Sequence, residues 1–195
     1  CLQREKCWLL EGNRYALGEI YRKDERYAEA IEEWKKTIEL DPKNADAYEA
    51  LGRVYLDTGS KVEDAITAFE NALAVDPKRK RVLGAIGDAF FTAGRWDEAV
   101  RRYQKALKEA PELTYIYYKI GRAFSEREQR GRGIDWYKKA VAADPQNAMA
   151  YYYLGFSYKD RLRRKEASAA FKKYLELKPD AADKREIEDE IAALE

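Results

Sequence analysis

Apolar residues recur along this chain in short stripes with the spacing of amphipathic helices, and residues 45–79 show the pattern most clearly. The two stripes of this segment are Tyr48, Leu51 and Tyr55, followed by Ala65, Phe69 and Ala72. Spacings of three and four residues place each set on one face of a helix. Gly52 lies inside the first helix, where it costs about 1 kcal/mol relative to alanine, so we expect it to permit a close helix crossing. Asp76-Pro77 ends the second helix, because proline cannot continue it. The segment therefore predicts a helix–turn–helix pair, and neither helix can bury its stripe alone.

The same pattern recurs five times. Prolines lie at positions 42, 77, 111, 145 and 179, at intervals of 35, 34, 34 and 34 residues. Each first helix has Leu or Ile before a glycine and an aromatic residue three positions after it; the glycines are Gly18, Gly52, Gly87, Gly121 and Gly155. Each second helix has a small residue and, four positions later, an aromatic one: Trp34, Phe69, Tyr103, Tyr137 and Phe171. A fixed period of this length indicates a repeat array, whose units bury their apolar faces against one another.

This pattern resembles the tetratricopeptide repeat family over residues 11–181. The resemblance implies an all-α fold, a right-handed superhelical solenoid of five helix–turn–helix repeats with a C-terminal capping helix. The expected segments are an N-terminal extension of the first helix (1–10), the repeats 11–44, 45–79, 80–113, 114–147 and 148–181, and the cap (182–195). Beyond residue 181 the repeat pattern is lost, but Ile187, Ile191 and Leu194 form a stripe whose surroundings are charged, as the end of a solenoid requires.

Four substitutions depart from the family pattern. Thr37 in the first repeat replaces a small alanine. Glu25 in the first repeat and Leu162 in the fifth replace the usual turn glycine. Gly133 stands where alanine is usual in the second helix of the fourth repeat. Because glycine disfavours helix, we expect that helix to begin late or to be loosened.

The composition argues against catalysis. The 195 residues contain no histidine, so the commonest general base and metal ligand are absent. No phosphate-binding loop, dinucleotide motif or metal-ligand spacing occurs. The formal net charge is +1, which gives no overall polyanion-binding signature. No apolar run is long enough for a membrane span. The chain is therefore interpreted as a protein without enzymatic activity, cofactor or metal.

The resemblance also implies where a partner binds. In the family, the first helices of the pairs line a concave groove that takes a peptide or a helix of another protein. Carried over residue by residue, the proposed contact residues are Arg81, Phe91, Tyr115, Tyr118, Arg122, Tyr152, Phe156 and Lys159. Glu19, Asp46 and Glu49 fall at the other end, so a partner with apolar anchors and an acidic end would fit in one direction. The lysine and asparagine pattern of the chaperone-binding carboxylate clamp is missing. We expect a protein-interaction scaffold that serves as an assembly or docking subunit of a larger complex.

A second function remains open, the binding of RNA or of an anionic surface through the late repeats. These repeats carry a basic zone: Arg127, Arg130, Arg132, Arg161, Arg163, Arg164 and Lys165. The competing explanation is a set of solvated turns. Polyanion binding weakens steeply with salt, so a salt titration separates the two functions.

The first residue of the sequence suggests a lipid anchor. Cys1 occupies the position that carries the lipid in mature bacterial lipoproteins, and envelope assembly lipoproteins built of these repeats give the nearest analogy. The alternatives are a fragment boundary or an engineered thiol. Lipidation of Cys1 would place the protein at the bacterial cell envelope; otherwise a cytoplasmic location is expected. Cys7 is interpreted as a small buried hydrophobe.

Overall fold

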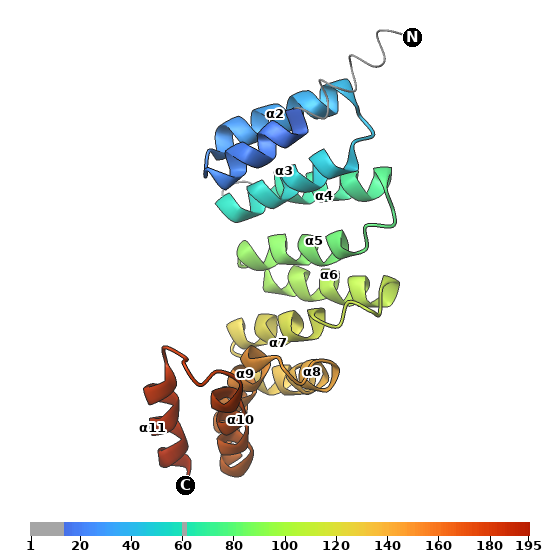
Figure 1. The fold of residues 1–195 in the computed structure, drawn as a ribbon. Coiled ribbons are helices and arrows are strands. Elements are labelled where there is room, and N and C mark those ends of the chain that lie inside the picture. The colour runs from blue at the N-terminus through green and yellow to red at the C-terminus, as the bar shows by residue number, and fades with distance from the viewer. Residues whose placement is uncertain (1–13, 60–61) are drawn as a thin grey trace. The chain divides into compact units, whose positions relative to one another are not determined.

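The structure, a computed structural model, describes residues 14–59 and 62–195 (Figure 1). Within these ranges the chain forms helices and turns and no β-strand, which confirms the all-α prediction. Helical residues 14–23 come first. They are followed by α2 (Tyr27–Leu40), α3 (Ala45–Thr58), α4 (Val62–Val75), α5 (Arg81–Thr92), α6 (Trp96–Glu109), α7 (Ile116–Glu126), α8 (Arg130–Ala143), α9 (Ala148–Lys159), α10 (Arg164–Leu177) and α11 (Lys184–Leu194). The extension predicted for residues 1–10, with Cys1 and Cys7, lies outside the described residues.

The helices form two compact units, the first ending at Arg95 and the second running from Trp96 to Glu195. In the first unit α3 packs against α2 and α4, and α4 packs against α5. In the second unit each helix from α6 to α10 packs against the next one in the chain. First helices of successive pairs also meet: α3 contacts α5, and α7 contacts α9. Within each unit, this brings first helices of neighbouring repeats together on one side.

A glycine in the first helix of a pair lies beneath an aromatic ring of the second. A Cβ atom added to Gly52 would lie 2.5 Å from the ring of Phe69, and one added to Gly121 would lie 2.6 Å from the ring of Tyr137. Gly18 with Trp34 and Gly155 with Phe171 repeat the arrangement. The four rings are completely buried. The expectation that Gly52 permits a close helix crossing is therefore confirmed, and the same contact recurs in other pairs.

The expectation of a late or loosened second helix in the fourth repeat is wrong. Helix α8 begins at Arg130 and runs for 14 residues, the same length as α6 and α10. Gly133 is buried, and a Cβ atom there would lie 3.1 Å from the carbonyl oxygen of Gly121. Glycine at this position allows α8 to approach α7 closely, and this packing outweighs the low intrinsic helix propensity of the residue.

The turns between paired helices share one backbone conformation whatever residue occupies them. Gly59 and Gly94 have φ angles of 64° and 70°, in the left-handed region that favours glycine. Glu25, Glu128 and Leu162 adopt the same conformation, with φ of 59°, 57° and 55°. All three occupy the position of the usual turn glycine; Glu25 and Leu162 were identified from the sequence, and the structure adds Glu128. The register of the repeat, and not the local residue, sets the turn.

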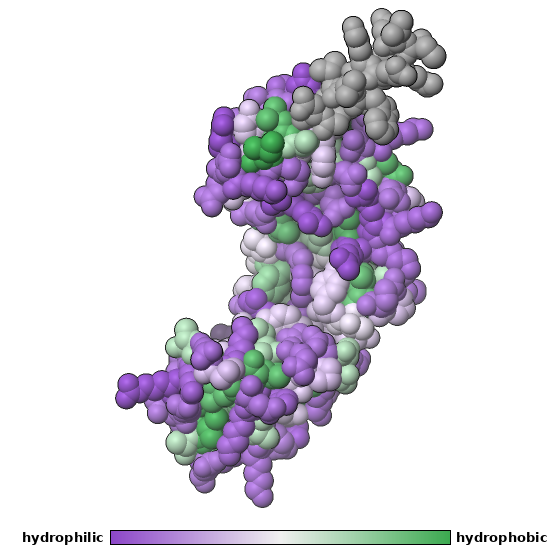
Figure 2. Space-filling model, viewed as in Figure 1, coloured by the Kyte–Doolittle hydropathy of each residue, from purple (hydrophilic) through white to green (hydrophobic). Residues whose placement is uncertain are grey.

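Helix α11 docks on α10 through one fully buried side chain, Ile187. In Figure 2 apolar residues gather where α11 faces α10, and hydrophilic residues cover most of the visible surface around them. Arg164 of α10 donates to the carbonyl oxygens of Ala193 (2.7 Å) and Leu194 (3.2 Å), which satisfies free acceptors at the C-terminus of α11. Among the described residues no helix combines the length and the apolar character that crossing a membrane requires.

Candidate partner-binding site

The proposed contact residues divide between the two units. Arg81 and Phe91 lie on α5 of the first unit, where Arg81 is exposed and Phe91 half-buried. The other six belong to the second unit, at the N-cap of α7, on α7 and on α9: Tyr115, Tyr118, Arg122, Tyr152, Phe156 and Lys159. Since α7 contacts α9, the residues of this group that lie on these two helices can form one surface.

Helix α9 supplies most of the aromatic rings of this surface. Its start is fixed by Asn147, whose side-chain oxygen accepts a hydrogen bond from the backbone N–H of Ala150 at 3.0 Å. The helix then carries Tyr151-Tyr152-Tyr153 and, one turn later, Phe156. Leu154 and Tyr158 take the core positions, so these four rings are left half-buried at the edges of the core. An aromatic residue that is only half-buried retains ring surface that a partner can cover.

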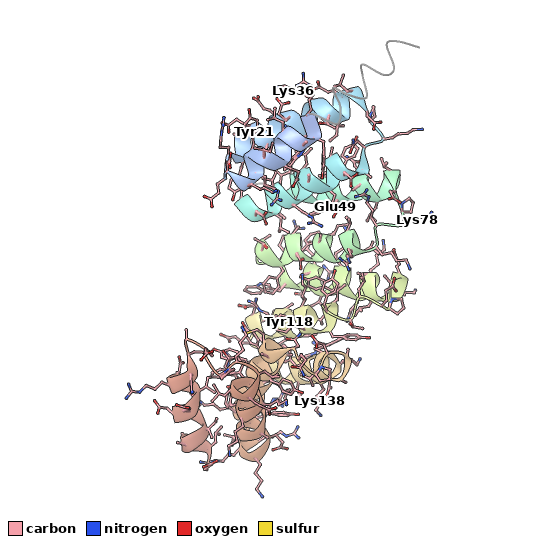
Figure 3. All side chains as sticks on the ribbon, in the orientation of Figure 1. Tyr21, Lys36, Glu49, Lys78, Tyr118 and Lys138 are labelled. Carbon is pink, nitrogen blue, oxygen red and sulfur yellow. The ribbon has the colours of Figure 1, made fainter. Side chains whose placement is uncertain are left out.

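The rings contact one another and are held in place. The centroid of Tyr152 lies 4.9 Å from that of Phe156 and 5.2 Å from that of Tyr153. Tyr118, which Figure 3 labels on α7, lies 5.9 Å from Tyr153. Tyr152 and Phe156 also meet core rings edge to face, at Tyr174 (5.2 Å) and Phe171 (4.9 Å). Four half-buried rings are therefore fixed by mutual contacts. They are Tyr118 of α7 with Tyr152, Tyr153 and Phe156 of α9, and we call them the aromatic cluster.

A pocket of about 350 Å³ opens beside this cluster, and we call it the α9 pocket. Its lining comes from four elements of the second unit: Ser125 and Glu126 of α7, Arg130 of α8, Tyr152, Tyr153 and Phe156 of α9, and Glu186 of α11. Tyr152 and Phe156 were proposed from the sequence. Tyr153 was missed, although the run of three tyrosines was a signal for it. Glu186 was missed because the position of α11 cannot be read from the repeat.

The cations near the pocket already have carboxylate partners. Arg122 pairs with Glu126 at 3.1 Å, and Arg130 pairs with Asp160 at 2.5 Å. The ammonium of Lys159 is 2.6 Å from a carboxylate oxygen of Glu190 on α11. The acidic partner end inferred from the sequence depended on Arg122 and Lys159 in this unit, and both are internally neutralised. In the second unit, the structure therefore offers no free basic residue among these two to bind an acidic end of a partner.

Carboxylates at the start of α11 act on Tyr152, one ring of the aromatic cluster. Burial raises the pKa of Tyr152 above its usual value, and the carboxylates of Asp183 and Glu186 raise it further. Burial likewise raises the pKa of Tyr118. The pKa of Tyr174 rises to about 12, because the ring is buried and its hydroxyl donates a 2.7 Å hydrogen bond to Asp183. The α11 carboxylate Glu186 and the preceding Asp183 therefore act on the ring of Tyr152, whereas the guanidinium of Arg122 lies 5.4 Å from the ring centroid of Tyr153.

Tyr115 does not join the cluster. It precedes α7, is 40% exposed, and has the ammonium of Lys119 5.2 Å from its ring centroid. On the same helix, Tyr117 lies 6.2 Å from Trp136 of α8 and does not line the α9 pocket.

The basic zone of the late repeats is largely paired within the chain. Arg127 pairs with Asp97 at 2.8 Å, and Arg163 pairs with Glu166 at 2.6 Å. Arg130 binds Asp160, and Arg164 caps α11, as described above. Arg132 lies over the ring of Phe124 at 5.0 Å. Most of these cations therefore have structural roles at turns and helix ends.

The acidic end proposed for the groove lies in the first unit, around Glu49 on α3 (Figure 3). Arg79 binds Asp46 at 2.8 Å and Glu49 at 2.9 Å, while Glu49 also binds Arg53 at 2.5 Å. These residues and Tyr15 border a hollow of about 270 Å³. Their charges are balanced within the network. Within residues 14–59 and 62–195, no cluster of three or more acidic or thiol side chains could hold a metal ion.

Comparison with known families assigns most of the chain to one repeat type. A family model described as a TPR repeat matches residues 18–59, and two described as a tetratricopeptide repeat match residues 59–113 and 114–147. Over 82 residues, 42% of this chain, the sequence is 36% identical to the Hsp70-Hsp90 organizing protein of Triticum aestivum. That match spans 13% of the length of the wheat protein.

Solved structures share the fold over nearly the whole chain. A crystal structure of MamA is 26% identical with a TM-score of 0.73, covering 83% of this chain and 94% of MamA. PilF of Pseudomonas aeruginosa is 19% identical with a TM-score of 0.74, covering 97% and 90%. YrrB, described as a TPR protein with an unusual peptide-binding site, is 19% identical with a TM-score of 0.67 and covers 90% of each chain. With three family models that together span residues 18–147 and with this shared fold, the chain belongs to the tetratricopeptide repeat family, whose members are protein-interaction scaffolds.

Proposed function

We propose that the chain is a docking subunit that binds a segment of a partner protein on the first helices of its second unit. The segment, a peptide or a helix, would lie against α7 and α9 and place an apolar side chain on the aromatic cluster. The scaffold itself would perform no chemistry; its role would be to hold the partner within a larger assembly.

The observation that carries this proposal is the half-buried cluster of Tyr118, Tyr152, Tyr153 and Phe156 beside the α9 pocket. Rings locked by mutual contacts lose little entropy on binding, so the area that they bury is retained as affinity. Clustered aromatic residues at the centre of an interface are the residues that most often dominate its energy. YrrB, which shares the fold, is described as having a peptide-binding site, and this agrees with the proposal at the level of the fold.

The test is capture of partners from the native source, followed by affinity measurements on the captured protein. Tyr118→Ala and Phe156→Ala should each weaken binding by about 1–3 kcal/mol if the rings are hot spots. Tyr117→Ala is the matched control, because it removes the same kind of side chain from α7 outside the aromatic cluster. Circular dichroism checks that each variant stays folded. If both cluster variants, Tyr118→Ala and Phe156→Ala, bind as tightly as the wild type, the partner docks elsewhere.

The RNA or anionic-surface alternative has less support, because most of the basic zone is paired within the chain. A salt titration of any captured complex separates the two proposals. Binding through the aromatic cluster should depend weakly on salt, whereas neutralisation of several phosphates would lower the affinity steeply as salt rises.

A further inference from the structure

The α9 pocket combines aromatic faces with an excess of negative charge. Its floor consists of the rings of Tyr152, Tyr153 and Phe156, and its charged side chains are Glu126, Glu186 and Arg130. Glu126 forms an ion pair with Arg122, and Arg130 forms one with Asp160, as described above. Glu186 is exposed and forms no ion pair within the described part of the chain. The one carboxylate that remains available therefore stands at the edge of an aromatic floor.

The surroundings of Glu186 add to this excess. A second, shallower hollow adjoins it, where Glu186, Asp189 and Glu190 outnumber Lys159 and Arg185. Since Lys159 is bound by Glu190, its charge does not offset Glu186. Within the described residues no cation lies over the ring of Tyr152, whereas Arg122 lies 5.4 Å from the ring centroid of Tyr153 and Lys159 lies 6.0 Å from that of Phe156. Tyr152 thus lines the pocket with no cation of the described chain over its ring, and Glu186 lines it as a carboxylate without an ion pair in the same part of the chain.

Such a combination selects a cation. The face of an aromatic ring carries negative charge and attracts a guanidinium or ammonium group within about 6 Å of its centroid. A long basic side chain can lay its methylene stem along the rings and extend its charged end to a carboxylate. Arginine suits this geometry best, because its planar guanidinium both stacks on rings and pairs with two carboxylate oxygens. A carboxylate ligand would be repelled by Glu186.

We infer that the α9 pocket is a recognition site for an arginine side chain of the partner segment, stacked on Tyr152 and paired with Glu186. This inference rests on the proposed function and specifies its partner as a basic segment, the opposite of the acidic end that the sequence favoured. Lysine would bind in the same place but more weakly, because it lacks the planar group.

The test uses N-acetyl-arginine amide as the probe in an NMR titration of the full chain with isotope-labelled tyrosine and phenylalanine. Wild-type protein should show saturable shifts of the Tyr152 and Phe156 ring signals. Glu186→Gln should weaken this binding by about fivefold, the loss expected for one exposed charge pair. Glu188→Gln, which removes the same charge from an exposed position on the same helix, should leave it unchanged. N-acetyl-norleucine amide and N-acetyl-glutamate amide serve as the uncharged and acidic probes.

The outcomes separate this inference from the proposed function. The inference fails if the arginine probe gives no saturable shift, if Glu186→Gln binds as tightly as Glu188→Gln, or if the glutamate probe binds at least as well. A captured partner that is lost with Tyr118→Ala but unaffected by Glu186→Gln would keep the docking surface and reject the arginine site. A partner indifferent to both changes would reject the docking surface, while the probe titration would still decide whether the pocket selects a cation.

Discussion

At the scale of single residues, the left-handed turns show what the repeat imposes on its sequence. Leu162 is 86% exposed and holds a φ angle of 55°, a conformation that costs an ordinary residue about 1–2 kcal/mol. Its side chain gains little from packing at this exposure, so the contacts of α9 and α10 on either side must hold the turn. The cost at Leu162 can therefore be removed by substitution without loss of core contacts.

We predict that Leu162→Gly stabilises the protein. Glycine removes the left-handed cost but loses about 0.5–1 kcal/mol more backbone entropy on folding, which leaves a net gain of about 0.5–1 kcal/mol. The measurement is the urea midpoint of unfolding followed by circular dichroism. Leu162→Ala is the control, because alanine keeps the strain and should give no gain. A lower midpoint for the glycine variant would show that the leucine side chain contributes more than the turn costs.

The glycines of the helix crossings give the opposite prediction. Gly121→Ala raises intrinsic helix propensity by about 1 kcal/mol, yet it should destabilise the protein by about 1–3 kcal/mol overall. The reason is that the added Cβ atom would lie 2.6 Å from the buried ring of Tyr137, which has no space to move.

Gly131→Ala is the matched comparison for this prediction. The three atoms nearest to a Cβ atom there all belong to the guanidinium end of Arg161, an exposed and flexible side chain that can move aside. The unfolding free energies of the two variants, measured by urea denaturation, should change in opposite directions. Equal effects of the two substitutions would refute the close-crossing explanation.

At the scale of elements, α11 depends on a single fully buried side chain. Ile187 is 0% exposed, whereas Ile191 and Leu194 of the same helix remain half-buried. The polar contacts that hold α11 include the Lys159–Glu190 and Lys172–Glu195 ion pairs, the Tyr174–Asp183 hydrogen bond and the cap from Arg164. Exposed ion pairs contribute little, so the apolar contact of Ile187 is expected to dominate docking.

We predict that Ile187→Ala costs about 2–5 kcal/mol of local stability, the range for truncating a buried aliphatic side chain. Hydrogen exchange should show the loss of protection in α11 and the adjoining part of α10, while α7 and α8 keep theirs. Ile20→Ala is the control, because Ile20 is 54% exposed and its truncation should change little. Uniform loss of protection throughout the second unit would mean that α11 is part of a larger cooperative core.

At the scale of the whole molecule, the features that could be predicted from the sequence are those that recur with the period of the repeat. The helix pairs, the glycine that lies beneath a ring in four of them and the position of the turns recur with the repeat, so the five copies of the sequence pattern specify them. Tyr152 and Phe156 could be proposed for the same reason, since they occupy repeated positions of a first helix. The prediction that the helix containing Gly133 begins late was wrong. It considered only the low helix propensity of glycine and could not include the close contact between Gly133 and the backbone of Gly121.

The charge pattern of the site could not be predicted, because it depends on pairs distant in the sequence. Lys159 and Glu190 are separated by 31 residues and meet only because α11 folds back onto the array. Likewise Arg130 meets Asp160 across 30 residues. No periodic signal links such residues, so the sequence suggested a basic rim where the structure has neutral pairs and one available carboxylate.

The glycine–ring crossings also bear on how far the repeats could be exchanged or redesigned. The ring differs from copy to copy, and its polar tip differs with it: Trp34 donates to the backbone oxygen of Tyr15 at 3.3 Å, and the hydroxyl of Tyr137 lies 2.9 Å from that of Ser125. Phe69 and Phe171 have no polar tip. A phenylalanine copy can therefore be transplanted with its glycine alone, and a tryptophan copy finds its acceptor in the backbone of the preceding helix, whereas the Tyr137 copy must bring Ser125 as its hydrogen-bond partner. The repeats therefore match in shape at the crossing, but they differ in the hydrogen bonds that the ring requires.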